Sequence, residues 1–250
     1  MKSVTGRGRG KRRLLLTVAL VLVAAVASAQ SGMGIYGGLN LGFGQFGADV
    51  EQRVVVGVNP TDLSQLTYTT ATHITRFKAF ALTPVVGITP FRDNGNFVLE
   101  RMAFEFQLAM KWGKYEYGWA AISGSEIRPG VLAKFNFSFA DWAGLFGNTG
   151  PAWGDRVATY AGLGFGIPIR TASLSYSSAY KQSFAQYEQM GVKVDLPDTK
   201  TTKAGFQILM EYGLNFKVND KFSLNWVMAG LGFIGHFTYD MTFGGNYHFR

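Results

Sequence analysis

Apolar and polar residues alternate one by one along most of the chain, which is the pattern of β-strands. From Met102 to Trp112 every even position is apolar, whereas the odd positions carry polar or small side chains such as Glu105 and Gln107. A helix could not sort residues onto two faces in this way. The same division predicts eight strands, at about residues 35–44, 79–88, 101–112, 131–139, 157–170, 203–217, 221–232 and 237–249.

The predicted strands and their connections suit a membrane barrel. Most of the strands hold about 10 to 14 residues, and roughly 9 to 11 cross a bilayer at a tilt. Long connections at 47–75 and 171–202 and a medium one at 113–128 alternate with tight turns, as in outer-membrane barrels. The connection 141–155 is longer than this pattern expects. It could instead contain a segment that lies along the surface, with Trp142, Leu145, Phe146 and Trp153.

A soluble barrel also alternates, so the composition of the two faces has to decide which one meets lipid. Gly162, Gly164 and Gly166 share the face opposite the bulky residues, and glycine is useful there only inside a crowded interior. The large apolar residues are therefore predicted to point outward into lipid. Aromatic residues near the strand ends fit two interfacial girdles, one with Trp112, Tyr115, Tyr117 and Trp119 and one with Phe91, Phe97, Tyr247 and Phe249.

The first 29 residues have the form of a secretory signal peptide. Basic residues end at Arg13, an apolar run follows over 14–27, and Ala27 and Ala29 supply the small residues before a cut at Gln30. We therefore expect residues 1–29 to be a cleaved signal peptide and residues 30–250 to form the barrel domain. The run is too short for a typical membrane-spanning anchor, which is the alternative. Without the segment the formal charge falls from +8 to +2, which argues against nucleic acid as a partner.

The chain resembles the small outer-membrane β-barrels of bacteria, the group that holds OmpW, OmpX and the transmembrane domain of OmpA. The resemblance covers about residues 31–250 through strand number, strand length, the signal peptide and the last strand, which ends Tyr247-His248-Phe249-Arg250. It implies insertion into the outer membrane by the barrel assembly machinery. The length, without a periplasmic domain, is more similar to OmpW and implies passive uptake of small apolar compounds. Arg250 departs from the aromatic last residue usual in this group.

Charged side chains on the predicted inward face are the candidate functional residues. Eight strands leave room only for side chains, so these charges are expected mainly to pair and fill the lumen. The alternative is a polar path across the barrel. The candidate lumen residues are Arg101, Glu105, Lys111, Lys134, Lys203 and Glu211.

No catalytic, cofactor-binding or metal site is predicted. The chain has no Cys, and its three histidines, His73, His236 and His248, do not share metal-ligand spacing. The glycines at 162–166 lie inside a strand and open no helix, so they do not form a nucleotide loop. We therefore expect no enzyme and no cofactor.

Two function hypotheses remain open at this point. The barrel is either a narrow passive channel for small, apolar solutes or a surface adhesin that binds an extracellular ligand through its loops. Tyrosines and a phenylalanine among Ser, Gln and Lys at 171–202 are typical of contact surfaces. Besides the solute or ligand, the expected partner is outer-membrane lipid.

Overall fold

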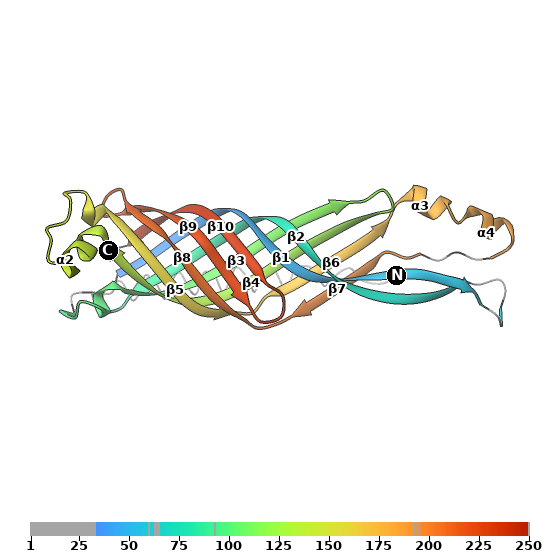
Figure 1. Cartoon of the computed structure of the whole chain (residues 1–250), viewed down its shortest axis with the longest axis horizontal. Helices are drawn as coiled ribbons and strands as arrows, with labels where there is room; N and C mark the ends of the chain where they lie inside the picture. Colours follow the sequence, from blue (N-terminus) through green and yellow to red (C-terminus); the bar gives the residue numbers. More distant parts are fainter. Residues whose placement is uncertain are drawn as a thin grey trace, which may run out of the picture.

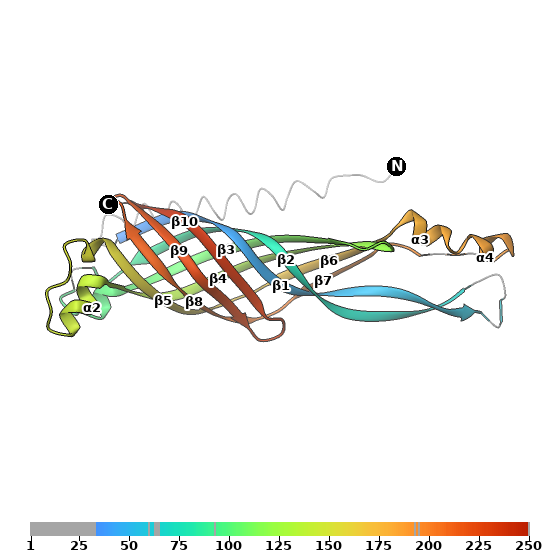
Figure 2. The ribbon, with the colours of Figure 1, turned by 45° about the horizontal axis from the view of Figure 1, so that its top comes forward.

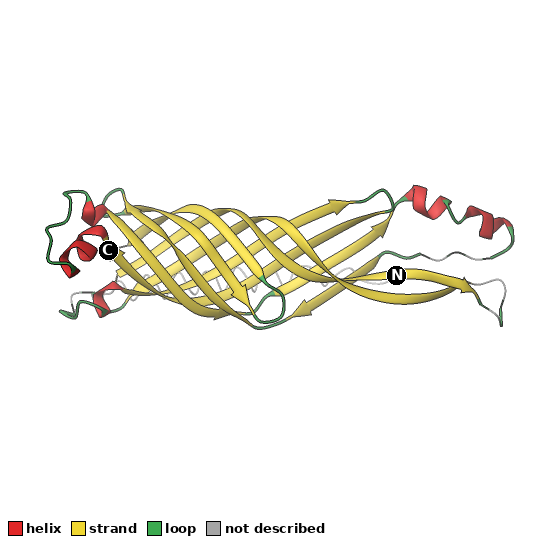
Figure 3. Cartoon of the chain, in the orientation of Figure 1, coloured by secondary structure: helices red, strands yellow, loops and turns green. Residues whose placement is uncertain are grey.

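The structure is a computed structural model that describes residues 34–59, 61–62, 66–92, 94–192, 194 and 196–249. The predicted signal peptide and Gln30 lie outside these residues. Short helices are found at both ends of a long barrel (Figure 3): η2 (Leu99–Arg101), α2 (Phe139–Leu145), η3 (Gly154–Arg156), α3 (Ser178–Gln182) and α4 (Ala185–Gln189). The strands are β1 (Gly34–Val58), β2 (Leu66–Thr89), β3 (Met102–Glu116), β4 (Ala120–Ser138), β5 (Val157–Gly166), β6 (Ile169–Tyr176), β7 (Thr199–Ala204), β8 (Gln207–Lys217), β9 (Phe222–Phe233) and β10 (Thr238–Phe249).

Eight of these strands close a ring by antiparallel pairing in the order β1, β2, β3, β4, β5, β8, β9, β10 (Figure 1). The last pair, β10 with β1, joins Phe249 to Ile35 and leaves no open edge at that level. This confirms the predicted fold class, an all-β, eight-stranded antiparallel up-and-down barrel.

The remaining two strands, β6 and β7, continue ring strands rather than adding to the ring. β4 pairs with β5 and β6 in one unbroken register, and β5 with β8 and β6 with β7 share another. Ile167 and Pro168 interrupt the first line, since proline has no N–H to donate to a ladder. Gly205 and Phe206 interrupt the second. The predicted strands 157–170 and 203–217 each span such a break.

The outer surface of the ring is apolar and its interior is polar, as the alternation predicts. On β3 the Phe106 side chain is 43% exposed, whereas the neighbouring Gln107 is buried. The glycine face of β5 points inward, where a Cβ on Gly162 would lie 3.1 Å from Cγ of Lys134. The assignment of faces made from the sequence therefore agrees with the structure.

The strands continue beyond the ring at the end opposite Gly34 and Phe249. The β9–β10 turn at 234–237 is short, while β1, β2, β6 and β7 run on past it, with α3 and α4 beyond β6 (Figure 1). We call residues 46–79, 113–124 and 169–204 the extension; in Figure 2 its β1–β2 hairpin diverges from α3 and α4. Its interior is apolar, with Phe46, Ala48, Val50, Phe77, Ala79, Ala120, Ile122, Ala172, Leu174, Tyr176 and Leu196 buried together.

Three predicted connections are wrong in extent, because strands occupy much of them. Most of 47–75 belongs to the β1–β2 hairpin, and 171–202 contains most of β6 and part of β7. The predicted connection 113–128 reduces to a turn at 117–119. In these segments neither face of the strands is uniformly polar, so apolar and polar residues alternate less regularly along the sequence than they do in the ring.

The other end, where Gly34 and Phe249 lie, is the terminal end. Here α2 occupies part of the long connection 141–155, with a capping box between Ser138 and Asp141. Burial raises the pKa of Asp141, but hydrogen bonds from Arg101 and Ser138 outweigh it and hold that pKa below the usual value. Several large side chains of this segment are exposed, namely Phe139, Trp142, Leu145, Phe146 and Trp153.

Candidate functional site

Two clusters of ionised side chains fill the lumen inside the ring. The first, which we call the terminal cluster, is centred on Lys134 of β4. Its Nζ lies 2.7 Å from Oε1 of Glu105 and 2.6 Å from Oε1 of Glu211. Gln107 Nε2 donates to Glu211 at 3.0 Å, and the Tyr36 hydroxyl donates to Glu105 at 3.0 Å. With two carboxylates and one ammonium, the terminal cluster carries one formal negative charge.

The second, which we call the central cluster, lies farther along the lumen toward the extension. Nζ of Lys111 is 2.5 Å from Asp240 and 3.3 Å from Glu126. Arg128 meets Asp240 at 2.9 Å, and Arg170, which reaches in from β6 at the base of the extension, meets Glu126 at 2.8 Å. All five side chains are buried. Three cations and two carboxylates leave one formal positive charge, which offsets the charge of the terminal cluster.

Little free volume separates the two clusters. A cavity of only about 20 Å³ lies between residues such as Gln107, Arg128 and Asp240, room for about one water molecule. Above the central cluster the apolar interior of the extension begins with Phe46 and Phe77, whose stacked rings have their centroids 5.1 Å apart. The axis of the barrel is therefore filled by ion pairs and then by aromatic rings.

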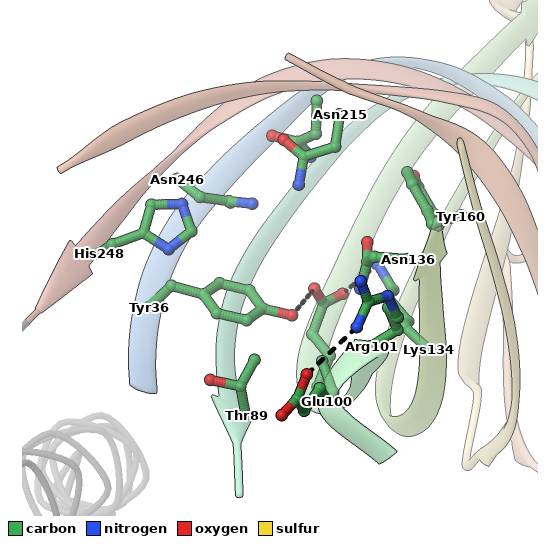
Figure 4. A pocket seen from close by; sticks show the side chains of 13 residues that line it. Tyr36, Thr89, Glu100, Arg101, Lys134, Asn136, Tyr160, Asn215, Asn246 and His248 are labelled. Atoms are coloured by element: carbon green, nitrogen blue, oxygen red, sulfur yellow. Dashed lines mark hydrogen bonds and ion pairs between the residues drawn. The ribbon is translucent and has the colours of Figure 1, made fainter. Parts of the chain in front are cut away.

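A polar cavity of about 250 Å³ opens at the terminal end below the terminal cluster (Figure 4). Tyr36, Glu105 and Lys134 of the terminal cluster line it, together with Glu100 and Arg101. Asparagine side chains from four strands line the rest, at positions 136, 215, 225 and 246. Water and small polar molecules can enter this cavity, but it ends at the ion pairs of the lumen.

The structure places four of the six predicted lumen residues in the lumen, in two clusters. Glu105, Lys134 and Glu211 form the terminal cluster, and Lys111 belongs to the central cluster. Arg101 lies at the mouth, where it pairs with Asp141 and its guanidinium stacks 4.1 Å from the Phe97 ring.

Lys203 is not a lumen residue, and its prediction needs correction. It lies on β7, above the β9–β10 turn, where the ring has no neighbouring strand on that side. Its side chain is 60% exposed and reaches Asp49 of β1 at 2.8 Å. Position in the alternation gives the face of a strand, but it does not tell whether the barrel is still closed at that height.

Sequence reasoning missed Glu126 and Arg128 as lumen residues, because it placed them in a connection. Both are buried on β4. Even positions point inward at Leu132 and Lys134, and the same parity extends back to 128 and 126. Continuing that parity through Gly130 and Pro129 would have found them.

The barrel wall has a seam between β1 and β7, directly above the β9–β10 turn. No ladder joins these strands; instead Lys203 pairs with Asp49, and Thr199 donates to the Glu51 carbonyl at 2.5 Å. His236 from the turn lies 3.6 Å from Asp49. The hydrogen bond from Lys203 outweighs the effect of burial and, together with the nearby His236, holds the pKa of Asp49 below its usual value.

A cavity of about 240 Å³ adjoins the seam. Its lining is mainly apolar, with Ala48, Ala204, Phe206 and Ile234 beside the polar groups of the seam. Ile234 has a φ of 75°, which is rare for a β-branched residue. Because its lining joins residues of β1, β7 and the β9–β10 turn, the cavity lies at the side of the wall.

Among the described residues, few side chains that could act as a nucleophile or a base lie in contact with one another. Ser223 Oγ lies 2.8 Å from Nε2 of His248 at the terminal end, but no carboxylate in the described chain is hydrogen-bonded to that ring. Among the described residues no group of His, Cys, Asp or Glu is arranged to hold a metal ion. No helix in the ranges described is long and apolar enough to span a membrane.

Comparison with known proteins finds likeness in architecture only. No protein-family model and no curated protein matches the chain. Among solved structures, Neisserial surface protein A is 12% identical and matches 88% of this chain and 98% of its own, with a TM-score of 0.44. The attachment invasion locus protein Ail of Yersinia pestis is 10% identical over 86% of this chain and 98% of its own, with a TM-score of 0.42.

The outer membrane protein OprG from Pseudomonas aeruginosa is 15% identical over 88% of this chain and 96% of its own, with a TM-score of 0.36. All three belong to the small bacterial outer-membrane β-barrels, the group to which the sequence was compared above. At such identities the likeness concerns the type of fold and not what the chain binds or transports.

Proposed function

We propose that this protein is an outer-membrane barrel that acts as a surface interaction protein through its extension. In this proposal the terminal end faces the periplasm, and the extension projects from the cell. The barrel anchors the extension and does not conduct along its axis. No enzymatic reaction is assigned to the chain.

The observation that carries the proposal is the filled axis. Buried ion pairs occupy the lumen at the level of Lys111 and Lys134, and packed aromatic rings follow at Phe46 and Phe77. An open pore needs a continuous water path, which these contacts interrupt. The extension, in contrast, has its own apolar core, so it presents ordered strands rather than loose loops.

Aromatic side chains connect this core to the outside of the extension. The ring centroids of Trp119, Tyr176 and Tyr180 lie within 6.2 Å of one another. The ring centroid of Phe184 lies 5.3 Å from that of Tyr180. At the surface, Tyr117 and Tyr187 are exposed. Rigid tyrosines lose little entropy on binding, which suits a contact surface.

The test combines conductance with adhesion. In planar bilayers the purified protein should give no steady ion conductance. Cells that display it should adhere to a host-cell layer, and replacing residues 48–75 by a four-residue turn should abolish adhesion while heat-modifiable gel mobility stays unchanged. A conducting wild-type protein, or full adhesion by the shortened variant, would contradict the proposal.

The seam cavity favours a second candidate function, passive entry of a small apolar solute through the wall. A solute would pass between β1 and β7 beside Phe206 and Ile234 instead of along the axis. Crosslinking the seam through Asp49→Cys and Lys203→Cys should then stop uptake of an apolar dye into liposomes, and reduction should restore it. Equal uptake in both states would exclude the seam as the route.

A further inference from the structure

Two neighbouring rows of side chains cross the outer wall at the base of the extension. The strand register places Phe43 of β1 beside Met241 of β10 and Phe80 of β2, with Trp112 of β3 next to Phe80. This row is apolar throughout. The row above it, toward the extension, changes to polar side chains at Tyr239, Gln45 and Lys78, and Lys114 follows Trp112 on the same face of β3.

This change marks the height at which the lipid tails give way to headgroups. Phe43 is 74% exposed, and its neighbours Phe80 and Met241 are exposed as well, so the row forms a continuous apolar surface that suits hydrocarbon. Aromatic and basic side chains are the usual residues at such a boundary. Lys78 therefore lies at headgroup level, directly above an apolar wall.

A groove on the outer wall joins the two rows. It has a volume of about 490 Å³ and runs over β1, β2 and β10. Phe43, Phe80 and Met241 line its apolar end, while Gln45 and Lys78 lie at the other end. The groove thus combines a surface for an acyl chain with hydrogen-bond donors and a cation.

The cations beside the groove are not neutralised by the chain itself. Within the described residues Lys78 and Arg76 form no ion pair, although both are exposed on the outer face of β2. Lys114 pairs only with Glu116, and both of these side chains are more than half exposed, so that water screens the pair. On this part of the outer face Glu116 is paired with Lys114 and Asp49 with Lys203, so Lys78 and Arg76 leave a local excess of positive charge.

We propose that this groove binds a phosphorylated glycolipid of the outer leaflet. One acyl chain lies along Phe43 and Met241, and Lys78 and Arg76 bind the phosphate. A guanidinium donates two hydrogen bonds to a phosphate and an ammonium adds a compact charge. The proposal rests on the orientation given under the proposed function, since it needs the extension to face outward.

Binding of purified diphosphorylated lipid A to the full chain in neutral detergent provides the test. The Lys78→Gln/Arg76→Gln variant should bind about 25-fold more weakly, since each cation near a charged lipid surface contributes roughly fivefold. The matched control, Lys181→Gln/Lys200→Gln, removes two exposed cations from elsewhere in the extension and should bind within about twofold of wild type. Heat-modifiable mobility establishes that each variant is folded.

Three results would overturn the lipid site: equal binding by the Lys78/Arg76 variant and wild type, equal binding of dephosphorylated lipid A, or equally tight binding of phosphatidylglycerol. Orientation is tested separately. Because the chain has no Cys, Thr72→Cys reports the side of the membrane by labelling of intact cells with an impermeant maleimide. Absent labelling refutes the orientation and with it the proposed function; labelling without lipid binding refutes the lipid site alone.

Discussion

Strands β1 to β4 run through both the ring and the extension, yet the lumen of the ring is ionic and the interior of the extension is apolar. On β1 the even positions point inward in both regions, with Asn40 buried in the lumen and Phe46 and Val50 buried in the extension. The direction of the side chains therefore does not change between the two regions. What changes is the chemistry of the inward face.

The surroundings of the wall explain this difference. Inside the ring the outer face meets lipid, so the apolar side chains point outward and polar groups must find partners in the lumen. Around the extension the outer face meets water, so burial of apolar side chains inside stabilises the structure. The change occurs at the height of Gln45 and Lys78, where the outer face also becomes polar. The alternation of residues shows which way each side chain points, and the polarity of each face shows whether that face meets water or an apolar surrounding.

The largest expected effect concerns the lumen. Lys134→Met should destabilise the barrel by about 3 to 5 kcal/mol, because Glu105 and Glu211 would lose the ammonium that they share. Unfolding by urea in lipid vesicles measures this loss. Adding Glu105→Gln and Glu211→Gln to the same variant should recover most of it. Failure of this recovery would mean that Lys134 acts through packing rather than through charge.

The second expected effect compares the outer face below and above the boundary. Phe106→Arg places a charge in lipid and should cost about 2 to 4 kcal/mol. Ile74→Arg lies on the outer face of β2 in the extension and should stay within about 0.5 kcal/mol of wild type. The same unfolding measurement serves both variants. Similar costs would show that the boundary does not lie between these positions.

The change in polarity of the inward face between the ring and the extension also limits what could be predicted from the sequence. The ring strands, such as 101–112, have one apolar and one polar face, so the ring could be predicted well. In the extension the inward face carries apolar side chains such as Phe46 and Phe77. The opposite, water-exposed face also carries apolar side chains, such as Ile74 and Val56. Neither face is uniformly polar there, and the alternation loses contrast. Strands of the extension were therefore mistaken for loops.

The lumen pairs were predictable in kind but not in detail. Parity identifies Glu105, Lys111, Lys134 and Glu211 as inward. Which of them pair depends on the stagger between strands that are distant in sequence, as with Lys111 and Asp240. The seam was beyond sequence reasoning, because it arises from the difference in height between the β9–β10 turn and its neighbours. Lys203 was misplaced for that reason.

The smallest expected effect concerns the seam and its dependence on pH. The hydrogen bond from Lys203, together with the nearby His236, lowers the pKa of Asp49. Their contribution is therefore fully present above the usual aspartate pKa of about 3.9 and is lost only as the pH falls through the lower, folded value. The effect on stability is small, because Lys203 is largely exposed and water screens its charge.

Spin labels on Val54→Cys of β1 and Lys200→Cys of β7 report the width of the seam. Their distance distribution should stay narrow from pH 7 to pH 4 and broaden only below that range, because Asp49 keeps its charge until then. In an Asp49→Asn background the distribution should be broad at every pH, since the amide cannot hold Lys203 as an ion pair. Broadening that already occurs between pH 7 and pH 4 in the wild-type chain would show that the charge of Asp49 does not control the seam. A narrow distribution in the Asn variant would show that the Thr199 contact to the Glu51 carbonyl is enough to close it.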